Sequence, residues 1–185
     1  MRLFIASDIH GSAVNLEKFF SIVDAALPEN PETKVILLGD TYNHGPRNPL
    51  PEGYAPMQVA KLLNDAMSFV TVIKGNCDSE VDEMISNFPI IGDFSMEWAG
   101  RTVFFTHGHK VNPDNPPTGA KKGDLVFYGH FHKPSVKEVN GVTYFCVGSV
   151  GIPFDGTPHS YAVLTEEKVQ LKSFDGEVLD EVPLG

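Results

Sequence analysis

The sequence has few cysteines and no apolar run long enough to cross a membrane. Cys77 and Cys146 are the only cysteines, which excludes the disulfide framework of a small secreted domain and favours a reducing, cytoplasmic setting. The first apolar stretch is interrupted by Asp8 and His10 too early for a signal peptide. We therefore expect a cytoplasmic protein that does not associate with a membrane.

Positive charge is also scarce. The chain has 14 lysines and arginines against 24 acidic residues, a formal net charge of −10, and a protein that binds the phosphate backbone of nucleic acids needs clustered basic side chains. Broad nucleic-acid binding is therefore not expected. Hydrophobic residues make up 42% of the sequence, a share that is ordinary for globular proteins. No repeat or linker is visible, so residues 1–185 are predicted to form one domain.

The predicted elements change in kind along the chain. Strands at 3–7, 35–38 and 69–73 alternate with helical patterns at 13–27 and 57–67, which predicts a βαβαβ unit. After a short helix at 79–87 the signals are mostly those of strands. These strands are predicted at 93–98, 101–106, 125–128, 134–139, 142–147, 160–164 and 169–174. The order favours an α/β fold of two packed sheets with helices outside.

Chemically distinctive side chains follow several of these strands. The apolar run 35–38 stops at Gly39 and Asp40, and in open α/β sheets the ligand crevice lies beyond the carboxyl ends of the strands. An isolated Gly-Asp pair more often only opens a turn. Here, however, the pattern recurs at other strand ends, which carry Asp8, His10, Asn76, His107, His109, His130 and His132.

The residue types at these strand ends are metal ligands. Four of the seven histidines form two His-x-His triplets, and the two-residue period of a strand places both rings of a triplet on one face. Mixed His, Asp and Asn ligands suit Mn²⁺, Fe²⁺, Ni²⁺ or Zn²⁺, and no cysteine spacing indicates a purely structural zinc. The ligands exceed the need of one ion. Two ions sharing a carboxylate would use them, an arrangement that serves phosphoryl displacement.

The chain carries these strand-end motifs in a fixed order: Asp8-x-His10, Gly39-Asp40, Gly75-Asn76-x-Asp78, His107-Gly108-His109 and Gly129-His130-x-His132. They resemble the calcineurin-like metallophosphoesterase superfamily. Three further strings resemble more narrowly its small bacterial phosphodiesterases of the YfcE type: Asn43-His44-Gly45-Pro46-Arg47-Asn48, Gly75-Asn76-Cys77-Asp78 and Gly148-Ser149-Val150. The resemblance implies a four-layer α/β/β/α sandwich of two mixed β-sheets flanked by helices, and metal-dependent hydrolysis of a small phosphodiester.

The resemblance also implies a division of the metal ligands between two divalent ions, with Mn²⁺ as the expected metal. The implied partition is Asp8, His10 and His132 for one ion, Asn76, His107 and His130 for the other, and Asp40 as the bridge. A hydroxide between the ions would attack phosphorus in line. The acceptors that orient the histidines have no signature in the sequence.

One position departs from the superfamily pattern. Much of the superfamily has a histidine after the motif's asparagine, placed to protonate the leaving group, and this chain has Cys77. Nearby dications favour a thiolate, so the thiol is a poor proton donor. We expect either a preference for good leaving groups or proton donation by His109 or His44, and the alternative is that Cys77 is a small buried residue without a catalytic part. Asp78 completes the expected catalytic set.

The long loop after Asp40 is expected to contact the substrate. Arg47 suits bidentate contact with a phosphate, and His44 and Asn76 complete the expected substrate-binding set. Two other functions stay open from the sequence. One is a phosphomonoesterase or cyclic-nucleotide hydrolase, and the other is a non-catalytic interaction scaffold, since a retromer subunit resembles the same group. Self-association also stays open.

Overall fold

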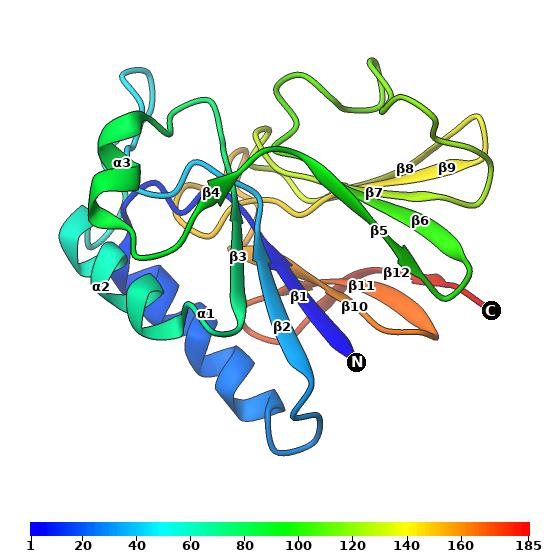
Figure 1. Ribbon diagram of the computed structural model, residues 1–185, viewed down its shortest axis with the longest axis horizontal. Helices are drawn as coiled ribbons and strands as arrows, with labels where there is room; N and C mark the ends of the chain where they lie inside the picture. Colours follow the sequence, from blue (N-terminus) through cyan, green and yellow to red (C-terminus); the bar gives the residue numbers. More distant parts are fainter.

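Two mixed β-sheets face each other in the computed structural model, which describes residues 1–185 (Figure 1). The seven-stranded sheet has the order β12-β11-β10-β1-β2-β3-β4. Its strands are β1 (Arg2–Ala6), β2 (Thr33–Leu37), β3 (Val70–Ile73), β4 (Ile90–Ile91), β10 (Ser160–Leu164), β11 (Lys168–Ser173) and β12 (Val178–Pro183). The five-stranded sheet has the order β5-β6-β7-β9-β8. Its strands are β5 (Phe94–Trp98), β6 (Arg101–Phe105), β7 (Leu125–Tyr128), β8 (Ser135–Val139) and β9 (Val142–Cys146).

Parallel pairing sets where each strand ends. The strands β1, β2 and β3 pair in parallel, as do β6, β7 and β9. The crossovers α1 (Ala13–Ala26) and α2 (Pro56–Ala66) connect the first three strands, as parallel pairing requires. The carboxyl ends of these parallel strands therefore point the same way within each sheet, and the loops beyond them can meet.

Three helices cover one face of the seven-stranded sheet (Figure 1). The helix α1 buries Leu16 and Phe19 against Phe4 and Val35 of the sheet, because its apolar residues recur at helical spacing. Pro56 begins α2, where its fixed φ and missing N–H carry no cost. A capping box at Ser79 begins α3 (Glu80–Ile85).

A second buried core, of 17 residues, lies between the two sheets, and the core under the helices has 19. Alternate residues of β1 point inward, so Leu3 and Ile5 meet Phe105 and Phe127 of the five-stranded sheet in one buried cluster. The outer face of the five-stranded sheet carries a smaller cluster with Tyr128 and Tyr144, against which residues of neighbouring segments pack.

The expected pair of mixed sheets is confirmed, and helices flank only the seven-stranded one. The outer face of the five-stranded sheet was expected to carry helices, but no helix lies there. Instead Ala120, from the segment that joins β6 to β7, packs against this face. Two strands, β4 and β12, were not predicted from the sequence. The strand β4 has two residues, too few for any periodicity, and β12 is largely exposed, with only Leu179 and Val182 packed against the core. No helix has the length and apolar character needed to cross a membrane.

Candidate functional site

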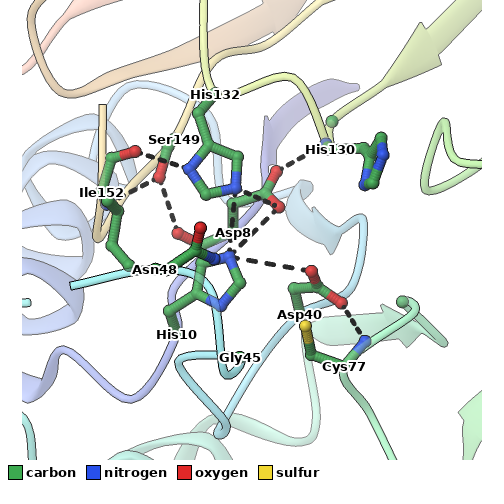
Figure 2. Close-up of polar contacts among 12 residues, drawn as sticks. Asp8, His10, Asp40, Gly45, Asn48, Cys77, His130, His132, Ser149 and Ile152 are labelled. Atoms are coloured by element: carbon green, nitrogen blue, oxygen red, sulfur yellow. Dashed lines mark hydrogen bonds and ion pairs between the residues drawn. The ribbon is translucent and has the colours of Figure 1, made fainter. Parts of the chain in front are cut away.

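The loops beyond the strand ends meet at one place and are tied by backbone hydrogen bonds. The N–H of Asp8 donates to the Gly39 carbonyl at 3.1 Å, and the N–H of His10 donates to the Asp40 carbonyl at 2.8 Å. From the other sheet, the N–H of His130 donates to Asp8 Oδ2 at 2.8 Å. These bonds fix the loops relative to one another, so the side chains converge between the two sheets (Figure 2).

Backbone strain is concentrated in the predicted metal ligands. Of the eight non-glycine residues with positive φ, five belong to that set: Asp8 (57°), His10 (50°), Asp40 (53°), His130 (68°) and His132 (57°). Left-handed conformations at such residues cost about 1–3 kcal/mol each and cluster at functional sites. The other three, Ala99, Asn140 and Asp155, each precede a glycine. The fold therefore carries strain where the predicted ligands stand.

Three buried side chains form the first ligand group. Asp8 Oδ1 lies 3.2 Å from His132 Nε2 and 3.5 Å from His10 Nε2, and the two Nε2 atoms are 3.1 Å apart. Asp8 Oδ1 is buried and has no hydrogen-bond partner, which is rare for a buried polar atom. An oxygen and two ring nitrogens this close together could hold a divalent cation.

The second group is built around Asp40. Its Oδ2 lies 3.4 Å from His107 Nε2 and 3.7 Å from His10 Nε2, and His130 is also close enough to share an ion with Asp40 and His107. Asn76 Oδ1 lies 3.0 Å from His107 Nε2. Asp40 thus stands between the two groups, which is the position of the expected bridging carboxylate.

Backbone carbonyls orient three of the histidines. The Nδ1 atoms of His10, His107 and His132 bond to the carbonyls of Asn43 (2.8 Å), Leu38 (2.7 Å) and Ile152 (2.6 Å), respectively. With Nδ1 as the donor, Nε2 presents its lone pair to the site, the tautomer that metal ligation needs. These acceptors leave no signature in the sequence, because every residue type has a backbone carbonyl.

Ser149 joins two of these loops, and its role was also missed. Its hydroxyl donates to the Asp8 carbonyl at 2.8 Å and accepts the N–H of Ile152 at 2.8 Å. In the sequence, the Gly148-Ser149-Val150 string is distinctive only through the family resemblance. The serine braces the loop whose carbonyl orients His132 (Figure 2).

The electrostatics of the site favour bound positive charge. Burial opposes ionisation of Asp8, but the close approach of the His10 and His132 rings outweighs it and holds the pKa of Asp8 well below its usual range. Burial likewise opposes protonation of His107, yet Asp40 and Asp8 raise the pKa of His107 to about 9. The pKa of Asp40 is lowered as well, so two buried carboxylates attract positive charge at this place, which bound divalent cations would supply.

Asp78 lies beside the site with its carboxylate turned to the backbone. Its oxygens accept the N–H groups of Asp40 (2.8 Å), Thr41 (2.8 Å) and Gly75 (2.7 Å). Burial, partly offset by these bonds, raises the pKa of Asp78. All three contacts are to backbone N–H groups of neighbouring loops, and none is to a metal ligand's side chain. The geometry therefore supports a positioning role in place of the catalytic role expected from the sequence.

A cavity of about 650 Å³ opens beside the ligand groups. Its wall consists of Asp40, Asn43, Gly45, Pro46, Arg47, Asn48, Asn76, Cys77, His130, His132 and Phe154. Arg47 and Asn76 are thus placed where substrate contact was expected. His44 is not on this wall, because its ring packs edge-on against Tyr54 at 5.3 Å between centroids. Another hollow, of about 700 Å³, lies at the opposite end of β1 and contains none of the predicted ligands.

The two other candidate catalytic side chains differ in position. His109 is exposed, with its ring centroid 5.3 Å from that of His107 and 6.1 Å from that of His130. Burial and then the charge on His107 lower the pKa of His109. Cys77 is half-buried on the cavity wall, and burial followed by the Asp40 carboxylate raises the pKa of its thiol to about 12. Carboxylates and bound dications would act on this thiol in opposite directions.

The glycine before His130 allows a close approach of two loops. A Cβ at Gly129 would overlap Ser7 Oγ and Asp8 Oδ2. We expect Gly129→Ala to displace the His130 loop, lower the melting temperature by several degrees and weaken metal binding, because overpacking costs about 1–3 kcal/mol. Gly92→Ala is the matched control, since a Cβ there has nothing within 4 Å. Equal melting temperatures and metal content in the two variants would contradict this expectation.

Comparisons with known proteins agree with the motifs. Residues 1–169 match the family model of the calcineurin-like phosphoesterase superfamily domain. The phosphodiesterase YfcE of Escherichia coli K12 is 40% identical over 168 residues, which are 90% of this chain and 89% of that protein. The structure of YfcE, a phosphoesterase from E. coli, superposes with a TM-score of 0.90 at 37% identity over all of both chains. The predicted family resemblance is confirmed.

A more distant similarity concerns the fold alone. Vps29 of Entamoeba histolytica in complex with Zn²⁺ superposes with a TM-score of 0.58 at 17% identity, covering all of both chains. That protein was crystallised with a divalent ion.

Proposed function

The chain belongs to the calcineurin-like phosphoesterase superfamily, and from this premise we propose that it is a metal-dependent phosphodiesterase that acts on a small phosphodiester through two divalent cations. The observation that carries the proposal is the position of Asp40 Oδ2, within 3.7 Å of a ligand nitrogen in each of the two groups. The identity to a protein named as a phosphodiesterase supports the diester as substrate.

The residues present fit two ions. Asp8, His10 and His132 would hold one, because Asp8 Oδ1 is buried and lacks a hydrogen-bond partner. His107, His130 and Asn76 would hold the other, and Asp40 would serve both. Bound there, divalent cations lower the pKa of water and stabilise charge on the phosphate oxygens. Nitrogen and oxygen ligands without thiolates suit Mn²⁺, with Zn²⁺, Fe²⁺ and Ni²⁺ as the competing ions.

The remaining residues would position the diester for in-line displacement by water. Arg47 lines the cavity and can form two parallel hydrogen bonds to phosphate oxygens. The amide of Asn76 borders the same space. Held on these groups, the scissile bond would lie against the ligand groups, with the leaving group directed to the open side of the cavity.

Hydrolysis of matched aryl esters tests the proposed function. Metal-stripped protein is supplied in turn with Mn²⁺, Zn²⁺, Ni²⁺ and Fe²⁺, and the rates with a bis-aryl phosphodiester and an aryl phosphomonoester are compared. We expect metal-dependent turnover with the diester preferred and Mn²⁺ the most active. Preference for the monoester would replace the proposal with a phosphomonoesterase. Metal binding without turnover of either ester would favour an interaction scaffold.

We also propose a single domain and a cytoplasmic location. One buried cluster joins residues of both sheets, which supports one folding unit. Cys77 and Cys146 are both free thiols, which fits a reducing compartment.

The Cys77 position should respond to restoration of the usual histidine. We expect Cys77→His to accelerate hydrolysis of diesters with poor leaving groups by about 100-fold, the lower range for general acid catalysis, and to change good leaving groups little. The measurement is the dependence of kcat on the pKa of the leaving alcohol. His109→Ala is the companion variant. If neither substitution changes this dependence, leaving-group protonation by these side chains is excluded.

A further inference from the structure

Two exposed phenylalanines stand beside the histidines of the Gly129-His130-x-His132 motif. The ring of Phe131 lies 5.2 Å from that of His130, and the ring of Phe154 lies 4.4 Å from that of His132. Their side chains are 48% and 38% exposed. Only Phe154 borders the cavity beside the ligand groups, because Phe131 faces a separate hollow of about 360 Å³.

One face of the Phe154 ring and the backbone of Phe154 are both held in place. One face stacks on the His132 imidazole with an interplanar angle of 25°. The N–H of Phe154 donates to the His132 carbonyl at 3.1 Å, and its carbonyl accepts the N–H and the hydroxyl of Thr157 at 3.0 and 2.7 Å. The same loop supplies the Ile152 carbonyl that orients His132. The aromatic surface is therefore preorganised, and little freedom is lost when a ligand contacts it.

The wall of this cavity combines a few apolar side chains with charged and amide groups. Phe154 is the only phenyl ring on this wall, which also carries Pro46, the Cys77 thiol, the guanidinium of Arg47, several amides and the proposed metal ligands. A phosphate held between the cations and Arg47 would place an ester arm near Phe154. A planar arm would find a ring for stacking and, from Asn43 and Asn48, amides for its polar edge. An alkyl arm would gain little from either.

We infer that Phe154 is a specificity-determining residue that stacks on a planar aromatic arm of the phosphodiester, an aryl group or a nucleobase. The inference rests on the proposed function and deepens it. Stacking on an aromatic side chain strengthens binding by about 5- to 100-fold per ring. Diesters with an aromatic arm are then the preferred substrate class, ahead of those with two alkyl arms.

Calorimetric titration of the Mn²⁺-loaded protein tests this inference without relying on turnover. The probes are ethyl phosphate, phenyl phosphate and a nucleoside 5′-monophosphate. The wild-type protein should bind at least one aromatic probe more tightly than ethyl phosphate. Phe154→Ala should raise the Kd of that probe by about 5- to 100-fold and leave the Kd of ethyl phosphate unchanged. If phenyl phosphate and the nucleotide both bind more tightly than ethyl phosphate, the site accepts aryl groups in general. If only the nucleotide binds more tightly, the site is specific for a nucleobase.

Three further variants separate stacking from other effects. Phe154→Trp should retain the preference, whereas Phe154→Leu, which keeps an apolar cover over His132, should lose it. Phe131→Ala is the matched control, because Phe131 is also exposed and also lies beside a ligand histidine but faces a separate hollow, and it should change no Kd. Metal content is measured throughout. If Phe154→Ala weakens the binding of all three probes equally, or weakens none, the inference is overturned. If the protein hydrolyses diesters but the Phe154 variants change no Kd, the proposed function stands and the stacking inference fails. If the Phe154 variants change the Kd of the aromatic probe but no diester is hydrolysed, the stacking site stands and the proposed function fails.

Discussion

Asparagine in place of Asp40 is expected to reduce metal-dependent diester hydrolysis by about 1000-fold or more. Asp40 Oδ2 is the carboxylate oxygen placed near His107 Nε2 and His10 Nε2, at 3.4 and 3.7 Å. Asp40→Asn removes the charge that would serve both cations, and three powers of ten correspond to about 4 kcal/mol of lost transition-state stabilisation. The amide oxygen can still accept the N–H of Cys77, which donates to Asp40 Oδ1 at 2.7 Å, so the fold should persist.

The measurement is kcat/KM with a bis-aryl diester, together with bound metal per chain and the melting temperature. Asp65→Asn is the matched control, because Asp65 forms an exposed ion pair with Lys61 on α2 and exposed pairs contribute little. Full activity in Asp40→Asn, with the metal still bound, would remove Asp40 from the proposed bridging position. A large drop in melting temperature would instead mean that the loss of activity reflects unfolding.

The positions of the ligand-type residues followed from the sequence because buried parallel strands leave a clear pattern. Each apolar run ends just before a ligand-type residue, so Asp40 and His107 could be placed beyond the carboxyl ends of their strands without a structure. The two strands belong to different sheets, and their meeting is visible only in the structure. The glycines beside them were also visible. The reason for these glycines could not be predicted. A Cβ at Gly75 would overlap Asp40, and this depends on how two loops pack against each other.

Roles that depend on side-chain direction could not be predicted. His44 lies in the loop expected to contact substrate, but its ring turns to Tyr54. Asp78 lies in a metal-ligand motif, but its carboxylate accepts backbone N–H groups. Phe154 was not singled out, because its place beside His132 is created by a loop far along the chain. Sequence patterns locate a residue on an element, whereas tertiary contacts decide where its side chain points.

The same dependence on tertiary contacts gives Asp78 its large expected effect on stability. Its two oxygens accept three backbone N–H groups, from the loops after β2 and β3, within a buried setting. Asp78→Ala would leave these donors without partners, and each buried unsatisfied donor costs about 1–3 kcal/mol. We expect a loss of at least about 3 kcal/mol in the free energy of unfolding, and a melting temperature lower by about 6–12 °C.

Two companion variants show what this loss means for the site. Asp175→Ala, at an exposed turn, should leave the melting temperature unchanged. Asp78→Asn keeps the volume and one acceptor oxygen, so it should fall between the wild type and Asp78→Ala. Because the N–H of Asp40 itself binds Asp78, a positioning role predicts weakened metal binding in Asp78→Asn, with kcat largely restored at saturating Mn²⁺. A kcat that stays low at saturating metal in a folded Asp78→Asn protein would return Asp78 to the catalytic role expected from the sequence.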